Sequence, residues 1–272
     1  MYLKIKSIAI VILTIFSIKS EAQVGFELGG WVGLSHYFGD LNTSFKLNHP
    51  GPAAGGNLRI LLNERLALKS SLNIGYIIGD DKYSSNPFEH DRNLKFHNTI
   101  FDFTNQFEFN FLPYIHGSSN DYFTPYLFTG LTIFHYNPRT SLAGKSYNLR
   151  EYGTEGQPLG DEYYEYGVAL PVGLGIKWDL NHKLSLNFEV SYKFTFTDYL
   201  DDVSTSYPNI GELNSLRGEI GVMLSDRSGI PGFSDQGKQR GNSRDKDKYS
   251  FTGISIMYFF GQLSCPEINK YN

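Results

Sequence analysis

The sequence predicts an all-β protein: an eight-stranded antiparallel up-and-down β-barrel that spans a membrane. Segments of the chain alternate apolar and polar residues with a period of two, which is the signature of strands with one apolar face. The connections between these segments alternate between tight turns and long polar loops, as they do in outer-membrane barrels. Aromatic residues make up 15% of the chain, with 21 Phe and 19 Tyr. This composition favours strands over helices.

The clearest alternation runs over residues 184–196. Leu184, Phe188 and Phe194 fall on an apolar face, and Glu189 and Lys193 fall on the opposite polar face. The stretch is longer than most soluble strands and suits a tilted membrane strand. Similar patterns predict the remaining strands at 24–35, 54–62, 66–78, 100–111, 126–136, 164–178 and 250–260.

The connections define the two sides of the barrel. Short ones are expected at 63–65, 113–123 and 181–182, and long polar ones at 39–51, 80–98, 137–162 and 197–248. Short turns lie on the periplasmic side of such barrels and long loops lie outside the cell. An even number of strands would return both termini to the periplasm.

A soluble β-sandwich and a lipocalin-like barrel are the alternatives, because the sequence does not reveal which face of the strands points outward. Three features favour the membrane: the aromatic-rich apolar face, the asymmetry of the connections, and the last strand, whose Tyr258-Phe259-Phe260 ending resembles the strand that marks such barrels for insertion. Trp178, Tyr136 and Tyr258 suit the interfacial aromatic belts. We therefore expect localisation in the outer membrane of a Gram-negative cell.

The ends of the chain are expected to lie outside the barrel. Residues 1–22 read as a signal peptide, with Lys4 and Lys6 before an apolar run and Ser20-Glu21-Ala22 at the cleavage site. A membrane anchor is the alternative, but the run is too short to span a bilayer. We assign 23–262 to the barrel and 263–272 to a periplasmic tail.

The inward face is expected to carry charges of both signs. Eight strands enclose a space just wide enough for side chains, and buried charges must pair because an unpaired one costs several kcal/mol. We predict a plugged lumen, with an ion path as the alternative. The predicted ion network comprises Glu27, Arg59, Lys69, Asp102, Glu108, Glu165, Lys177, Glu189 and Lys193.

The last outer loop is too long for an unstructured connection in a compact protein. Apolar residues such as Leu213, Ile220 and Leu224 follow helical spacing, and Asn209 is placed to cap the helix. We predict a short helix over the barrel mouth, with an extended hairpin as the alternative. The following segment, 238–248, mixes charge signs and is expected to be a solvated loop.

Chemical motifs are lacking in the sequence. No histidine lies in a serine-hydrolase or zinc-binding context, and His90, Asp91 and His97 read more simply as loop residues than as a metal site. Asp201-Asp202 and Asp245-x-Asp247 lack the ligand count of a calcium loop. We expect no enzymatic activity, no cofactor and no metal. The net charge of -4 gives no sign of a nucleic-acid partner.

Cys265 is the only cysteine, which rules out a disulfide within the chain. The predicted topology places it in the periplasm, an oxidising compartment. Two readings stay open: a shielded thiol, and a mixed disulfide that tethers a periplasmic partner.

At the family level, the chain resembles the PorG-like small outer-membrane barrels of the type IX (Por) secretion system of Bacteroidota. The resemblance spans most of the chain after residue 22 and is most specific at residues 196–204 (FTDYLDDVS), 226–228 (DRS), 240–242 (RGN) and 246–254 (KDKYSFTGI), and at Cys265-Pro266.

The resemblance implies a non-enzymatic component that anchors the periplasmic lipoprotein ring of this secretion system, which in gliding species also serves gliding motility. The implied partners are the ring lipoprotein and outer-membrane lipid, with Cys265 as the candidate tether. The alternative function is a stand-alone surface barrel whose outer loops bind ligands or host molecules.

Overall fold

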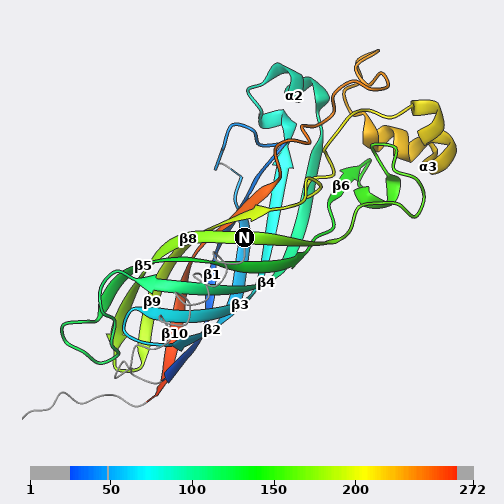
Figure 1. The fold of residues 1–272 in the computed structure, drawn as a ribbon. Helices are drawn as coiled ribbons and strands as arrows, with labels where there is room; N and C mark the ends of the chain where they lie inside the picture. Colours follow the sequence, from blue (N-terminus) through cyan, green and yellow to red (C-terminus); the bar gives the residue numbers. More distant parts are fainter. Residues whose placement is uncertain (1–24, 48, 262–272) are drawn as a thin grey trace, which may run out of the picture.

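The computed structural model describes residues 25–47 and 49–261. The predicted signal peptide, the tail and Cys265 therefore lie outside the described residues. Eight of the ten strands form a closed antiparallel barrel (Figure 1). They are β1 (Gly25–Phe38), β2 (Gly51–Leu61), β3 (Leu66–Asp80), β4 (Lys95–Asn110), β5 (Phe123–His135), β8 (Tyr166–Asn181), β9 (Leu184–Thr195) and β10 (Lys248–Gly261).

The predicted fold class is confirmed. Each barrel strand pairs with the next barrel strand along the chain. The first, β1, also pairs with the last, β10, from Gly25 opposite Gly261 to Phe38 opposite Lys248. The barrel therefore has no unpaired edge, which is what a bilayer demands because lipid offers no hydrogen-bond partners.

The faces of the strands settle what the sequence left open. Along β4 exposure alternates over the whole strand. Phe101 and Phe103 are 53% and 42% exposed, whereas Asp102 and Glu108 are 4% and 0% exposed. The apolar face points outward and the charged face inward, the reverse of a soluble barrel. The outward face meets lipid, and the protein is an outer-membrane β-barrel.

The long connections carry additional structure at the extracellular end (Figure 1). A hairpin of two further strands continues the sheet beside β4, where His97 faces Arg139. None of the described helices has the length and hydropathy of a membrane span. The elements of this end are η1 (Asp81–Tyr83), α2 (Pro87–Arg92), β6 (Arg139–Leu142), β7 (Lys145–Asn148), η2 (Leu149–Tyr152) and α3 (Ile210–Ser225).

The helix predicted in the last outer loop is present as α3. The Asn209 side chain caps it by accepting hydrogen bonds from the backbone N–H groups of Gly211 and Glu212, at 2.9 and 3.2 Å. Gly218, at φ 73°, breaks it into two short helices. The Arg217 guanidinium donates to the Glu151 carbonyl oxygen at 2.7 Å and so joins α3 to the 149–162 segment.

The prediction that 238–248 is a solvated loop is wrong for part of this segment. Arg240 and Asp247 are both 1% exposed. Arg240 is buried because it neutralises Glu155 from another loop and Asp202 from a distant part of its own loop. Such contacts between distant residues leave no local pattern. Arg244, Asp245 and Lys246 do remain exposed.

Candidate functional site: a filled lumen and an extracellular cap

The periplasmic half of the lumen is organised around Glu108, a fully buried carboxylate on β4. One of its oxygens lies 2.8 Å from Arg59 Nε and 2.7 Å from Lys177 Nζ, and the other lies 3.7 Å from Lys69 Nζ. Arg59 also pairs with Glu27, and Lys69 with Glu189. Glu27 and Arg59 face each other on the paired strands β1 and β2. The Lys177–Glu108 and Lys69–Glu189 contacts join strands that are not paired, because the lumen is narrow enough for side chains to meet across it.

A second cluster fills the lumen nearer the extracellular end. Lys193 Nζ lies 2.5 Å from Asp102 Oδ2, and the Tyr249 hydroxyl donates to the same oxygen at 2.9 Å. In the Glu108 cluster, the Tyr126 hydroxyl donates to Glu189 at 2.7 Å. Eight of the nine predicted lumen charges thus lie in these clusters.

Glu165 is the ninth, and the structure places it elsewhere. It precedes β8, is half-buried, and makes no ion pair with any residue of the described chain. The alternation of 164–178 extended the predicted strand by two residues beyond its observed start at Tyr166. The assignment of Glu165 to the lumen network is therefore wrong.

The sequence analysis missed the closure of the periplasmic mouth by His116. This residue lies on the 111–122 connection, where no periodicity marks it. Its Nδ1 lies 2.7 Å from Asp179 Oδ1 and its Nε2 lies 2.6 Å from Glu27 Oε1. The ring also stacks on Phe259, with centroids 4.3 Å apart. The turn thus folds back into the barrel end and plugs it.

Little space is left between the two clusters. A cavity of about 30 Å³ lies among Trp31, Asn73, Lys69, Glu189 and Lys193. A water molecule needs roughly 10–15 Å³ measured in this way, so the cavity holds on the order of two waters. The lumen is therefore filled by side chains, and chemistry with external molecules must take place at the two ends of the barrel.

The extracellular end is closed by loop residues that form a buried cluster. Tyr37 on β1 donates its hydroxyl to Asp201 and also lies 3.1 Å from Asp247 Oδ1. Asp247 in turn accepts from the Leu200 backbone N–H at 2.9 Å. We call this cluster, together with Arg92, Arg240 and the carboxylates around them, the cap.

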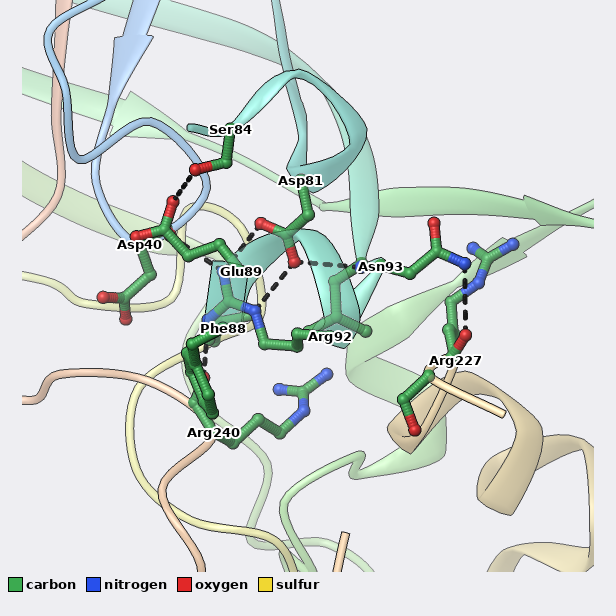
Figure 2. A network of polar contacts seen from close by, with 12 residues as sticks. Asp40, Asp81, Ser84, Phe88, Glu89, Arg92, Asn93, Arg227 and Arg240 are labelled. Carbon is green, nitrogen blue, oxygen red and sulfur yellow. Dashed lines mark hydrogen bonds and ion pairs between the residues drawn. The ribbon is translucent and has the colours of Figure 1, made fainter. Parts of the chain in front are cut away.

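Arg92, on α2, joins three loops of the cap. Its guanidinium pairs with both Asp81 carboxylate oxygens at 2.8 Å. It also donates to the backbone carbonyls of Asp40 at 2.8 Å and Arg240 at 2.6 Å. Figure 2 shows this network, with the Asp40 carboxylate pointing away from the Arg92–Asp81 ion pair. A guanidinium has five N–H donors, so one arginine can bind a carboxylate and several backbone carbonyls at the same time.

Arg240 is the second junction and joins the last loop to the third. Its Nη1 donates to Glu155 at 3.1 Å and to the Asp202 carbonyl at 2.6 Å, and its Nη2 lies 3.6 Å from Asp202 Oδ2. Its Nε donates to the Ser225 carbonyl at the end of α3 at 3.3 Å. Arg92 and Arg240 together therefore connect all four extracellular loops.

Three of the four aspartates in the acidic pairs noted in the sequence belong to this cap, whereas Asp245 is exposed. Asp201, Asp202 and Asp247 are buried, each with a tyrosine, threonine or arginine partner. Within residues 25–47 and 49–261, no cluster of His, Cys, Asp or Glu has the arrangement of a metal site. His97 instead packs its ring against Tyr76, with centroids 5.8 Å apart.

A model of the family described as Domain of unknown function (DUF6089) matches residues 5–226. The chain belongs to this family. No curated protein matches it.

Solved structures of small outer-membrane proteins are similar to this DUF6089 protein only in a general way. Ail of Yersinia pestis, in complex with a heparin analogue, shares 10% identity at a TM-score of 0.42, over 88% of this chain and 99% of that one. Neisserial surface protein A shares 8% at 0.44, over 86% and 97%. OprG of Pseudomonas aeruginosa shares 11% at 0.44, over 90% and 100%.

The cap of this DUF6089 protein contains more buried carboxylates than buried cations, and the pKa values of several of these carboxylates are raised. Burial raises the pKa of Asp40 to about 6, and the charges of Asp198 and Glu155 act in the same direction. Burial also raises the pKa of Asp198 and of Asp202 to about 6. Burial and the Asp40 carboxylate raise the pKa of Asp201 well above its ordinary value.

These shifts predict that the cap is more stable in mild acid than at neutral pH. A carboxyl group with a raised pKa in the folded state binds protons more tightly there, so stability falls as the pH rises from the unfolded pKa, near 3.8, to the folded pKa, about 6. Amide hydrogen exchange, corrected for intrinsic rates, should show stronger protection of residues 198–206 at pH 5 than at pH 7.5. Peptides from β6 and β7 serve as the control, and equal or weaker protection at pH 5 would contradict the prediction.

Proposed function

We propose that this protein is a non-enzymatic outer-membrane component of the type IX secretion system that anchors the periplasmic lipoprotein ring to the outer membrane. The observation that carries the proposal is the filled lumen. A barrel with paired charges inside and His116 across its periplasmic mouth suits a membrane anchor rather than a channel. The resemblance of the stretches around Asp201 and Arg240 to the PorG-like barrels supplies the identity of the system.

The periplasmic turns are the proposed contact surface. The 111–122 connection is held in one conformation because Asp179 accepts from both His116 and the Gly117 backbone N–H, at 2.7 and 2.9 Å. A turn ordered in this way offers a partner a fixed surface and loses little entropy on binding. Exposed residues of this side include Ser119, Asn120, His182 and Lys183.

The C-terminal tail contributes a second proposed contact, a mixed disulfide between Cys265 and the ring lipoprotein. The tail follows β10, whose end lies on the periplasmic side, and thiols are readily oxidised in that compartment. The two contacts make different predictions, because only the disulfide responds to reductant.

The proposal predicts that periplasmic substitutions lower recovery of the ring lipoprotein. Outer membranes would be solubilised gently, the tagged barrel captured, and partners eluted with and without reductant. The double variant His182→Glu/Lys183→Glu reverses charge on the periplasmic side and should reduce recovery of the lipoprotein several-fold. Lys145→Glu, at the exposed first residue of β7 on the extracellular side, is the control and should leave recovery unchanged.

The outcomes separate the alternatives. If Cys265→Ser leaves recovery intact, the tether is lost but the anchor stands. If the wild-type barrel is recovered without any periplasmic partner, the anchor proposal fails, and a stand-alone surface barrel that acts through its outer loops becomes the better account.

A further inference from the structure

We propose that a crevice on the extracellular surface is a binding site for a neutral saccharide of one or two sugar rings. The crevice lies between the 39–47 segment, α2 and the 239–248 segment, and it goes beyond the secretion role proposed above. Its volume is about 450 Å³, within the range of small-molecule sites. The crevice is concave, opens to the outside, and is formed by loops that Arg92 and Arg240 hold in place.

An exposed aromatic residue, Phe45, borders the crevice in an unfavourable conformation. Its side chain is 60% exposed and its backbone has a φ of 54°, a region that bulky residues avoid at a cost of order 1 kcal/mol or more. Its ring stacks on Phe38 at 4.4 Å. Phe88, from α2, is 39% exposed and also lines the crevice. The Phe88 ring stacks on Phe233, with centroids 5.4 Å apart, so Phe45 presents the larger open apolar surface, which suits the C–H face of a sugar ring.

Unused hydrogen-bonding groups lie beside these rings. Asp40 Oδ2 accepts from the Asn242 backbone N–H at 2.9 Å, whereas its other carboxylate oxygen has no partner in the described chain. The Gln239 side-chain amide is exposed and likewise has no partner there. An open acceptor near an open donor matches hydroxyl groups, each of which donates and accepts.

The charges of the crevice favour an uncharged ligand. Its lining carries three carboxylates and four cationic side chains, a formal sum of +1. The cations are largely engaged: Arg92 pairs with Asp81, Arg240 with Glu155, and Lys248 lies 3.7 Å from Asp245. An ion is attracted by a field of one sign, which this lining does not provide, whereas a polyol uses donors and acceptors of both kinds.

The test is saturation-transfer NMR on the full-length barrel with a mixture of cellobiose, maltose, lactose, mannobiose and N,N'-diacetylchitobiose. The protein would be held in dodecylphosphocholine, because maltoside detergents carry a competing sugar. At least one disaccharide should receive saturation. Phe45→Gly, which removes the ring and suits the left-handed backbone, should weaken binding by about fivefold or more. Asp40→Asn should do the same by removing an acceptor.

The experiment includes a control variant and a charged probe, a sulfated heparin disaccharide. Tyr164→Ala removes an aromatic side chain that is 84% exposed and is not part of the crevice, and it should leave binding unchanged. The proposal is overturned if no disaccharide receives saturation, if Phe45→Gly and Asp40→Asn bind as the wild type does, or if only a sulfated heparin disaccharide binds.

Discussion

Replacing Glu108 by glutamine is expected to lower the free energy of unfolding by about 3–5 kcal/mol, the usual cost of removing one partner of a buried ion pair. Glu108 is the common partner of Arg59, Lys69 and Lys177, and all four side chains are at most 4% exposed. Without the Glu108 charge, Arg59, Lys69 and Lys177 stay buried with one carboxylate fewer to neutralise them. Urea unfolding of the barrel in lipid vesicles, followed by the mobility of folded and unfolded bands in gels, measures the change.

The control for this experiment is Glu219→Gln, the same substitution at an exposed position on α3. It should change stability by no more than about 0.5 kcal/mol, as surface substitutions do. Equal stability of the two variants would mean that the Glu108 network contributes nothing, and the description of the lumen as an ion-paired plug would have to be abandoned.

The second large effect is expected in the cap. Arg240→Met keeps a long apolar side chain but leaves Glu155 and Asp202 buried without a cation, again a loss of about 3–5 kcal/mol. The loss is local, because Arg240 joins loops and not strands. Proteinase K added to intact cells should therefore cut the 197–247 loop of the variant, while the barrel itself remains folded.

Arg244→Met is a suitable comparison because Arg244 lies four positions further along the same loop and is exposed. Its loop should resist the protease as the wild-type loop does. Rapid cleavage of both variants, or of neither, would show that Arg240 does not hold the cap together.

Local signals in the sequence explain why most of the secondary structure could be predicted. The apolar and polar alternation of β4 is carried by the side chains themselves, and Asn209 caps α3 through atoms only two and three residues away. Helix α2 was missed although a local signal existed: Asn86 caps it, Pro87 follows at its first turn, and Glu89 accepts from the Asn86 amide. That combination is a recognisable helix start.

The candidate sites are a different matter, because they depend on contacts between distant residues. Arg92 reaches the carbonyl of Arg240 across 148 positions of the chain, and His116 reaches Glu27 across 89. Neither contact has a spacing that a strand or helix repeats, so no periodicity reveals it. The same reason explains why Arg240 and Asp247 were expected in solvent. Glu165 has a different explanation, because the apolar and polar alternation continues two residues beyond the start of β8.

The sequence by itself determined that the chain forms strands with one apolar and one charged face, joined by connections of alternating length, because these properties are set by neighbouring residues. Only the tertiary structure decided that the apolar face points outward, that Glu108 lies at the centre of the lumen charges, and that two arginines join the outer loops into a cap. Closing the barrel fixes which strands meet and therefore which charges can pair, and that is a property of the whole chain.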